Sequence, residues 1–357
     1  SPSLHERAMA DVIEPELKSL GFDIVYDKTG EVIGGDCGNL IASKKGTIDG
    51  VFRLGLSVHL DTVVSTEQWG YILNGDEICA AGNTILGADD KAGIAAIIEA
   101  LRVVNELNIP HGDIQVILSV SEETGVTGAR HIDRELIKSD AVYVFDVGEP
   151  VGMVYIAAPY HSEIKAEFTG KGSHAGMCPE NGISSILVAG YAITRMKLGR
   201  IDHETTANIG IINGGTAVNA IPETCVIKGE ARSIDNLKFE NQINHMRESC
   251  ESAASEMGVT IKYEVIDWYG GYHLDPDSKA VKLALNAVAS SGLDPKTGFT
   301  GGGSDANIFN QQGIPSVPIG IGYKNAHSVR ESIAISDLKA TASIVIGMII
   351  EAGRHSM

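Results

Sequence analysis

Apolar, β-branched runs that end in an acidic residue or a histidine constrain the fold of this chain more than any other feature of its sequence. Three such runs, at residues 51–60, 114–120 and 141–145, read as buried strands. The last two are almost continuously apolar, which a strand needs when both faces of its sheet are covered. These strands predict an α/β sheet whose carboxyl edge collects ionisable side chains.

Segments with helical spacing alternate with these strands and support the α/β class. The N-terminal helices are expected at residues 4–20, 90–107 and 128–137. Beyond Pro159 the order changes to βαββαβ, which is typical of a small α+β domain with an open sheet. Its strands are expected at residues 163–169, 206–212, 224–231 and 260–265, and its helices at 183–196 and 237–257. The alternation of helices and strands then resumes, with a helix start at Asp275, a buried strand at 316–321 and a last helix from Ser336.

The domain organisation predicted from this order is a small domain inserted into a larger one. A chain of 357 residues is long for a single compact domain. We place the larger, discontinuous catalytic and metal-binding domain at residues 1–160 and 271–357, and the inserted domain at residues 161–270. A hydrophobic content of 43% with 21% charged residues predicts that the chain folds throughout.

Charge and cysteine usage exclude several classes of partner. A formal net charge of −18 with no cluster of Lys or Arg argues against nucleic acid as a partner. The five cysteines are widely spaced and form no C-x-x-C pair, which favours a reducing compartment over a disulfide framework. We found neither a signal peptide nor an apolar stretch near the roughly 20 residues of a membrane span. The sequence therefore predicts a cytoplasmic protein with no membrane association.

His59 and Asp61 lie two residues apart at the end of the first strand-like run. The period of two along a strand puts both side chains on one face, where the carboxylate can orient the imidazole of a metal-bound histidine. For this short pattern on its own, a structural histidine with a satisfied hydrogen bond is the favoured explanation.

Further acidic residues and a histidine recur in order along the chain. Asp89 and Asp90 open a helix, and for an isolated pair this would be explained by favourable charge at a helix N-terminus. Glu122 and Glu123 follow the second strand; the remaining candidates are Asp146, which ends the third strand, and His327, which follows the strand at 316–321. Oxygen and imidazole ligands without thiolates suit two divalent ions, Zn²⁺ first and Mn²⁺ or Co²⁺ as alternatives.

Five strings resemble the ordered motifs of the M20 family of metallopeptidases, in particular its peptidase T-like, tripeptidase-like members. They are His59-Leu60-Asp61-Thr62, Gly87-Ala88-Asp89-Asp90-Lys91, Ser121-Glu122-Glu123-Thr124-Gly125, Asp146 and Ala326-His327. The resemblance spans almost the whole chain. It implies a zinc-exopeptidase-like catalytic domain with a mixed central sheet flanked by helices, and a ferredoxin-like inserted domain that acts as lid and dimerisation domain.

The resemblance also implies a role for each residue of the centre. Asp89 would bridge two ions, one of them held also by Glu123 and His327 and the other by His59 and Asp146. Glu122 would be the general base that takes a proton from the attacking, metal-activated water and returns it to the leaving amine. Asp61 would orient His59, and the peptide bond between Asp89 and Asp90 would be cis.

The inserted domain contributes further candidates by the same resemblance. His174, in a glycine-rich turn, would polarise the substrate carbonyl across a homodimer, while Asn219 and Arg232 would bind substrate. Gly302 and Gly303 lie in the run Gly301-Gly302-Gly303-Ser304-Asp305 and would line the peptide cleft; a turn that caps a helix at Ser304 is the alternative. The run lacks the G-K-[ST] ending of a phosphate-binding loop.

The predicted function is a dinuclear zinc-dependent exopeptidase of aminopeptidase type that hydrolyses di- and tripeptides. Two other functions stay open from the sequence. One is hydrolysis of N-acyl amino acids or of carboxyl-terminal residues, which the family resemblance also allows. The other is a non-catalytic, metal-stabilised binding protein, which the presence of Glu122 and of every expected ligand disfavours.

Overall fold

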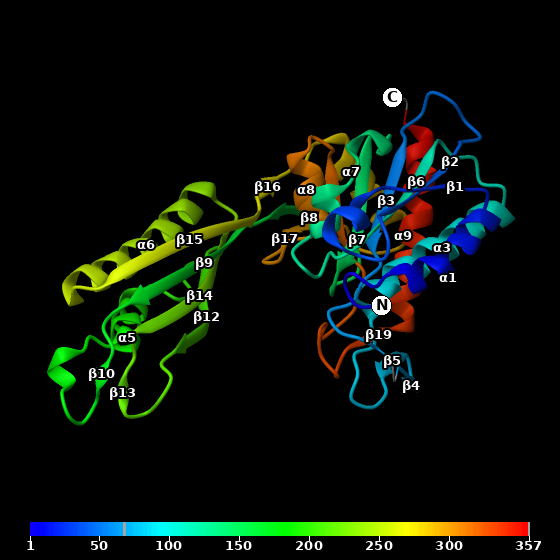
Figure 1. Cartoon of the computed structure of the whole chain (residues 1–357). Helices are drawn as coiled ribbons and strands as arrows, with labels where there is room; N and C mark the ends of the chain where they lie inside the picture. Colours follow the sequence, from blue (N-terminus) through cyan, green and yellow to red (C-terminus); the bar gives the residue numbers. More distant parts are fainter. Residues whose placement is uncertain (67–68, 356–357) are drawn as a thin grey trace. The chain divides into compact units, whose positions relative to one another are not determined.

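The chain divides into two compact units, each described here by itself. The computed structural model describes residues 1–66 and 69–355 (Figure 1). The first unit comprises Ser1–Ala157, His273–Thr300 and Ser304–Met357. The second comprises Ala158–Tyr272 together with Gly301–Gly303, so in sequence it interrupts the first unit twice.

A mixed sheet of nine strands forms the centre of the first unit, in the order β1-β2-β6-β3-β7-β18-β8-β16 with β17 paired to β8. Its strands are β1 (Asp23–Tyr26), β2 (Leu40–Lys44), β3 (Leu54–His59), β6 (Ile114–Ser119), β7 (Ala141–Val147), β8 (Met153–Ala158), β16 (Tyr272–His273), β17 (Lys296–Phe299) and β18 (Ser316–Gly320). A smaller sheet joins β4 (Tyr71–Asn74), β5 (Glu77–Ala80) and β19 (Ser332–Ala334).

The four central strands of the large sheet are parallel. β3 pairs in parallel with both β6 and β7, and β18 pairs in parallel with β7. Every residue of β3, β6 and β18 is buried, as expected for strands covered on both faces. The carboxyl ends of these strands therefore meet at one edge of the sheet, as the sequence predicted.

Helices cover both faces of this sheet (Figure 1). They are α1 (Arg7–Ser19), α2 (Thr29–Ile33), α3 (Ala88–Glu106), α4 (Thr127–His131), α7 (Lys279–Ser290), α8 (Asp305–Gln311) and α9 (Ile335–Arg354). α3 and α9 pack against each other and against β3, whereas α8 packs against β7 and β18 from the other side. The predicted fold class, a mixed central sheet flanked by helices, is confirmed. Among residues 1–66 and 69–355, no helix has the length and apolar character that crossing a membrane requires.

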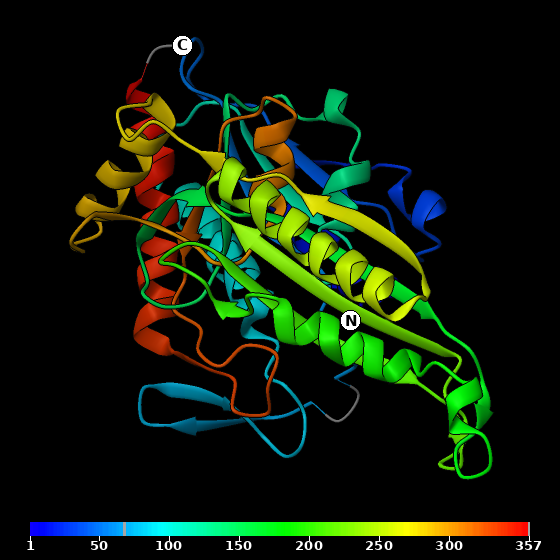
Figure 2. The same ribbon diagram turned by 90° about the vertical axis from the view of Figure 1, so that its left-hand side faces the viewer.

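The second unit is a five-stranded antiparallel sheet with two helices on one face. The sheet has the order β11-β12-β14-β9-β15. Its elements, with a two-stranded ribbon β10-β13, are β9 (Tyr160–Thr169), β10 (Ser173–His174), α5 (Ser185–Arg195), β11 (Gly199–Arg200), β12 (Thr206–Gly214), β13 (Ala220–Ile221), β14 (Thr224–Ser233), α6 (Asn236–Met257) and β15 (Thr260–Tyr269). Figure 2 shows α5 (green) and α6 (yellow-green) side by side over the sheet. Residues of β9 alternate between buried and half-buried, the pattern of a sheet with one covered face.

One predicted helix is wrong in extent. Instead of a helix over residues 128–137, the structure has the short α4 and a separate 3₁₀ turn at Arg134–Leu136. Ile132 adopts extended backbone angles, φ −58° and ψ 136°, which end α4. The side chain of Asp133 then accepts a hydrogen bond from the backbone N–H of Glu135 and starts the 3₁₀ turn.

A close approach of α3 to the central sheet yields a stability prediction. A Cβ atom at Gly93 would lie 2.5 Å from the carbonyl oxygen of Phe145 and 2.8 Å from Cγ1 of Val58. We therefore expect Gly93→Ala to destabilise the fold by about 1–3 kcal/mol through overpacking, although alanine favours helices. Chemical unfolding followed by circular dichroism measures this change.

A substitution at an exposed position of the same helix calibrates the experiment. Ala95 is exposed, so Ala95→Gly should cost only the difference in helix propensity, about 1 kcal/mol. If Gly93→Ala instead stabilises the protein by an amount similar to the cost of Ala95→Gly, the close approach has no energetic consequence.

Candidate metal centre and active site

The end of β3 holds an imidazole and a carboxylate that face each other. His59 is the last residue of β3, and its Nδ1 lies 3.3 Å from Oδ1 of Asp61. Both side chains are buried. The Asp61 carboxylate also accepts the backbone N–H groups of Glu122, at 3.0 Å, and of Glu123, at 3.1 Å. Asp61 thus connects the end of β3 to the loop after β6.

The Asp89 carboxylate lies between two imidazoles. Its Oδ1 is 3.0 Å from Nε2 of His59, and its Oδ2 is 3.2 Å from Nε2 of His327. Asp89 lies in the first turn of α3 with non-helical backbone angles, and the peptide bond to Asp90 is cis, as expected. A carboxylate with one oxygen directed at each of two nitrogen ligands has the arrangement that bridging two cations requires.

Glu123 and Asp146 complete two groups of ligand atoms around Asp89. Oε1 of Glu123 lies 3.0 Å from Nε2 of His327, and Oδ1 of Asp146 lies 3.5 Å from Nε2 of His59. Both carboxylate side chains are only 8% exposed, whereas that of His327 is 50% exposed. The structure therefore brings together the five residues that the sequence marked as candidate ligands.

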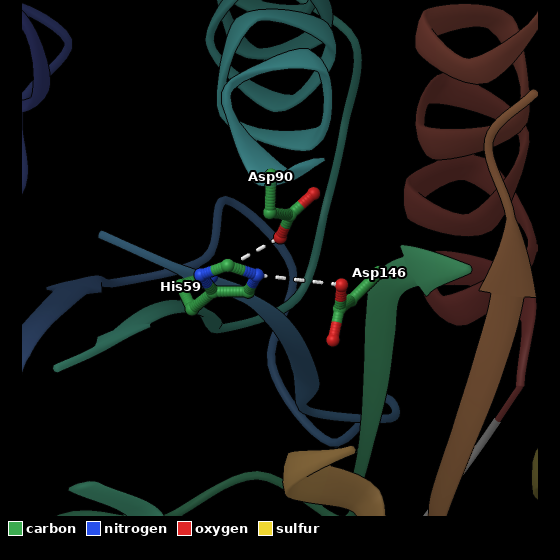
Figure 3. Close-up of side chains that lie close together, drawn as sticks. All are labelled: His59, Asp90 and Asp146. Carbon is green, nitrogen blue, oxygen red and sulfur yellow. Dashed lines mark hydrogen bonds and ion pairs between the residues drawn. The ribbon is translucent and has the colours of Figure 1, made fainter. Parts of the chain in front are cut away.

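Asp90 is a further buried acid that lies near the same imidazole (Figure 3). Ligand atoms of His59, Asp90 and Asp146 fall within 4.8 Å of one another, so geometry alone would admit Asp90 as a ligand. Oδ2 of Asp90, however, accepts the backbone N–H of His59 at 3.1 Å. Asp90 is not among the predicted ligands, and this hydrogen bond instead gives it the role of fixing the end of β3.

Negative charge exceeds positive charge among these side chains. The basic partners within the cluster are His59, His327 and Lys91, whose Nζ donates to the carbonyl oxygen of Asp61 at 2.8 Å. The carboxylates are Asp61, Asp89, Asp90, Glu122, Glu123 and Asp146. Buried charges without compensation are costly, so this donor set fits the binding of divalent cations.

The acidities of two carboxyl groups reflect that excess. Burial, followed by the charge of Asp146, raises the pKa of Glu122 well above its ordinary value. Burial also raises the pKa of Asp146 to about 7, although the neighbouring His59 opposes the rise. A raised pKa is what a carboxylate needs to accept a proton near neutral pH.

Two contacts that support the site could not be predicted from the sequence, because they join distant segments. Oε1 of Glu6 accepts the backbone N–H of Ser121 at 2.9 Å, directly before the two glutamates. The hydroxyl of Ser3 donates to Oδ2 of Asp61 at 2.6 Å. No local motif marks either contact, since the paired residues lie 115 and 58 positions apart.

The second unit brings His174 and Asn219 together. β10 pairs with β13 so that His174 is opposite Ala220, and the backbone N–H of Ala175 donates to the carbonyl oxygen of Asn219 at 2.9 Å. The backbone N–H groups of Gly176 and Met177 donate to Nδ1 of His174, so its Nε2 remains available for other contacts.

Arg232 and the glycine run form a second pair within this unit. The Arg232 guanidinium donates to Oε2 of Glu230 at 3.0 Å and to the carbonyl oxygen of Gly301 at 3.4 Å. A Cβ atom at Gly303 would lie 2.1 Å from the ring of Tyr269, so a larger residue there would require this ring to move.

The end of the glycine run caps a helix. Ser304 is the N-cap of α8: its hydroxyl accepts the N–H of Ala306, and its own N–H donates to Oδ1 of Asn307 at 3.1 Å. The capping interpretation is confirmed, and binding of substrate by Gly302 and Gly303 stays a prediction.

His174 with Asn219 and Arg232 with its glycine run lie at opposite ends of the second unit's sheet. β13 leads into the first residue of β14, Thr224, whereas Arg232 is the penultimate residue of that strand. At roughly 3.3 Å per residue, the strand separates the two pairs by about 25 Å. The structure therefore does not bring His174 and Arg232 of one chain together.

Comparisons with known proteins agree with this geometry. Residues 55–351 match the model of peptidase family M20/M25/M40. The uncharacterized protein YqjE of Bacillus subtilis (strain 168) is 39% identical over 356 residues, which covers 99% of this chain and 95% of that protein.

Two solved structures are similar over nearly the whole chain. Aminopeptidase PepT from Bacillus cereus ATCC 10987 is 40% identical with a TM-score of 0.91, covering 99% of this chain and 94% of that one. A tripeptidase from Staphylococcus aureus subsp. aureus mu50 is 37% identical with a TM-score of 0.96, covering 99% and 95%. The predicted family is confirmed, and the chain belongs to peptidase family M20/M25/M40.

Proposed function

We propose that this protein is a dinuclear, metal-dependent exopeptidase that removes the amino-terminal residue from short peptides, with tripeptides and dipeptides as substrates. The observation that carries the proposal is the Asp89 carboxylate, whose two oxygens face the imidazoles of His59 and His327. The similarity of this chain to an aminopeptidase and to a tripeptidase, at 40% and 37% identity, supports short peptides as the substrate class.

The residues around Asp89 are suited to hold two divalent ions. Glu123 and His327 would hold one ion with Asp89, and His59 and Asp146 would hold the other. Zn²⁺ fits this mixture of imidazole and carboxylate ligands, and Mn²⁺ and Co²⁺ are alternatives. Bound there, the ions would supply Lewis acidity that polarises a carbonyl and lowers the pKa of a water molecule.

Glu122 is proposed as the general base. Its carboxylate would take a proton from the water whose oxygen attacks the peptide carbonyl carbon, and would deliver it to the amine nitrogen as the C–N bond breaks. In the metal-free protein, burial and the charge of Asp146 raise the pKa of Glu122. Asp61 would orient His59 and, through two backbone N–H groups, the loop that carries Glu122.

Arg232 is proposed to bind the free carboxylate of a short peptide, with Asn219, Gly302 and Gly303 as further substrate contacts. The Arg232 guanidinium is held by Glu230, which in turn lies 2.9 Å from Nε2 of His161. This hydrogen bond to His161, followed by the charge of Arg232, lowers the pKa of Glu230 to about 2. A fixed guanidinium is suited to bidentate recognition of a carboxylate.

We further propose that the protein acts as a homodimer in which His174 serves the site of the partner. The separation of about 25 Å between His174 and Arg232 along β14 supports this proposal. An extended tripeptide spans only about 10 Å, so these two residues of one chain cannot contact the same substrate.

An exposed apolar surface on the second unit supports dimerisation there. Ile186 and Leu187 of α5 are 41% and 50% exposed, and Ile211 and Ile212 of β12 are 48% and 49% exposed. β11 pairs only with Thr206 and Ala207 of β12, so within the described residues the rest of that strand is a free sheet edge. The inserted segment, residues 161–270, would then act as lid and dimerisation domain, and a cytoplasmic location belongs to the same proposal.

Metal binding should stabilise the first unit. Zinc at about 100 times its Kd should add about 2.7 kcal/mol to the free energy of unfolding of chelator-treated protein. Thermal unfolding with and without zinc measures the effect. Asp89→Asn should abolish it, because Asn lacks the charge and the second acceptor oxygen.

Asp202 provides the matched control for that experiment. It lies with His203 and Glu204 in another acidic group, but the Lys238 ammonium already lies 3.1 Å from Asp202. Asp202→Asn should therefore leave the zinc-dependent rise unchanged. Equal rises in wild type and Asp89→Asn would refute the assignment of Asp89.

Loss of the general base should separate turnover from metal binding. Glu122→Gln should lower kcat by about 10²- to 10⁴-fold while the metal content stays at two ions per chain. Steady-state kinetics and elemental analysis measure the two quantities. Glu135→Gln, at an exposed position, removes the same charge and should change neither.

The nature of the substrate can be tested with matched peptides. Tripeptides and dipeptides with free amino ends should be hydrolysed, whereas acetylated peptides and N-acyl amino acids should not.

Arg232→Lys should raise KM about 10- to 100-fold for peptides with a free carboxyl end, because a charged bidentate pair contributes about 1.5–3 kcal/mol. Amidated peptides and the exposed control Arg200→Lys should show no such change. Faster hydrolysis of N-acyl amino acids than of free peptides would favour the amidohydrolase alternative instead.

A further inference from the structure

Glu331 is a buried acid outside the set of residues assigned so far to the metal centre. It is 1% exposed, and both oxygens of its carboxylate accept backbone hydrogen bonds. Oε2 accepts the N–H of Gly87 at 2.7 Å, and Oε1 accepts the N–H of Asp89 at 2.9 Å. The carboxylate therefore holds the main chain on either side of Ala88.

These two N–H groups lie at the start of α3, where a helix cannot satisfy its own donors. The N-cap residue is Gly87, which has no side chain with which to cap the helix. Glu331 takes that place from 244 residues further along the chain. The backbone of Asp89 is thus fixed by a residue from a different segment.

The segment that carries Glu331 also carries His327. Lys324 and Ser332 exchange backbone hydrogen bonds of 2.8 and 3.1 Å, which close the loop between them at its base. The carbonyl oxygen of Glu331 accepts the N–H of Ala80 at the end of β5, which ties the loop to the small sheet. One closed loop therefore contacts Asp89 twice, through the His327 imidazole at its side chain and through Glu331 at its backbone.

A displacement of Asp89 would disturb both imidazole contacts at once. Its two carboxylate oxygens face different histidines at 3.0 and 3.2 Å, so a shift of its main chain changes both distances. Fixing the main-chain N–H of Asp89 limits the positions that its carboxylate can reach. Residues that orient metal ligands in this way commonly affect metal affinity about 10- to 100-fold.

We propose that Glu331 is a positioning residue that holds the backbone of Asp89 where its carboxylate would serve both metal sites. The inference rests on the proposed dinuclear function. It predicts that both metal sites depend on Glu331, although both oxygens of its carboxylate are engaged by backbone N–H groups and it is not proposed as a ligand.

Glu331→Gln tests the proposal with little change in side-chain volume. Glutamine offers one acceptor oxygen and an NH₂ group, so one of the two backbone N–H groups would face a donor. Zinc titration by calorimetry should show both affinities reduced about 10- to 100-fold. The cobalt-substituted variant should also have an altered d–d absorption spectrum, which a change in fold stability alone would not produce.

Glu77→Gln is the matched control. Glu77 lies in β5 of the neighbouring small sheet, and its carboxylate pairs with Lys324 at the base of the same loop at 2.9 Å. The substitution removes the same charge from the same region without touching Asp89. Both zinc affinities of this variant should equal those of wild type.

The outcomes separate this inference from the proposed function. If wild type binds fewer than two zinc ions, the dinuclear proposal fails and the role of Glu331 fails with it. If wild type binds two ions and Glu331→Gln binds both equally well, only the role of Glu331 is overturned. Should Glu331→Gln not fold, Glu331→Asp keeps the charge but cannot reach both N–H groups; unchanged affinities in that variant would equally overturn the proposal.

Discussion

Repulsion among carboxylates at the carboxyl ends of the parallel central strands is the constraint on which the rest of the first unit depends. Like charges in a buried site are costly unless hydrogen bonds or cations compensate them. The chain supplies six backbone N–H groups for this purpose, which are donated to four acids. The pairs are His59 with Asp90, Glu122 and Glu123 with Asp61, Ser121 with Glu6, and Gly87 and Asp89 with Glu331. By accepting these hydrogen bonds, the four acids fix the main chain that carries the proposed metal ligands.

The same edge contains backbone conformations that side chains disfavour. Ser121 has φ 51° and His327 has φ 62°, in the left-handed region that glycine normally occupies. Each such residue costs of order 1–3 kcal/mol and persists only where its surroundings fix it. Glu6 fixes Ser121 with two hydrogen bonds, to its N–H and its hydroxyl. The paired backbone bonds of Lys324 and Ser332 close the loop around His327.

The sequence predicts an element or a contact when a pattern of neighbouring residues marks it, and fails when the contact joins distant segments. β3, β6 and β7 were predictable because continuous apolar runs mark strands covered on both faces, and the acids at their ends followed from the parallel order. The β4-β5 hairpin was missed, because Tyr71–Asn74 lacks the alternation of a half-buried strand, and the structure leaves it exposed throughout. Glu6 and Glu331 were missed for another reason: their partners lie 115 and more than 240 residues away.

The separation in sequence between Asp89 and Glu331 has a consequence for biosynthesis. The contact spans 242 residues, and His327 approaches Asp89 from almost as far. Contacts of such long range are slow to form, because they close a long loop at a cost in chain entropy. A nascent chain that has not yet reached residue 331 can build the strands around His59 but lacks the loop that fixes Asp89. The centre therefore lacks both His327 and Glu331 until synthesis has passed residue 331, and a shorter nascent chain cannot assemble it.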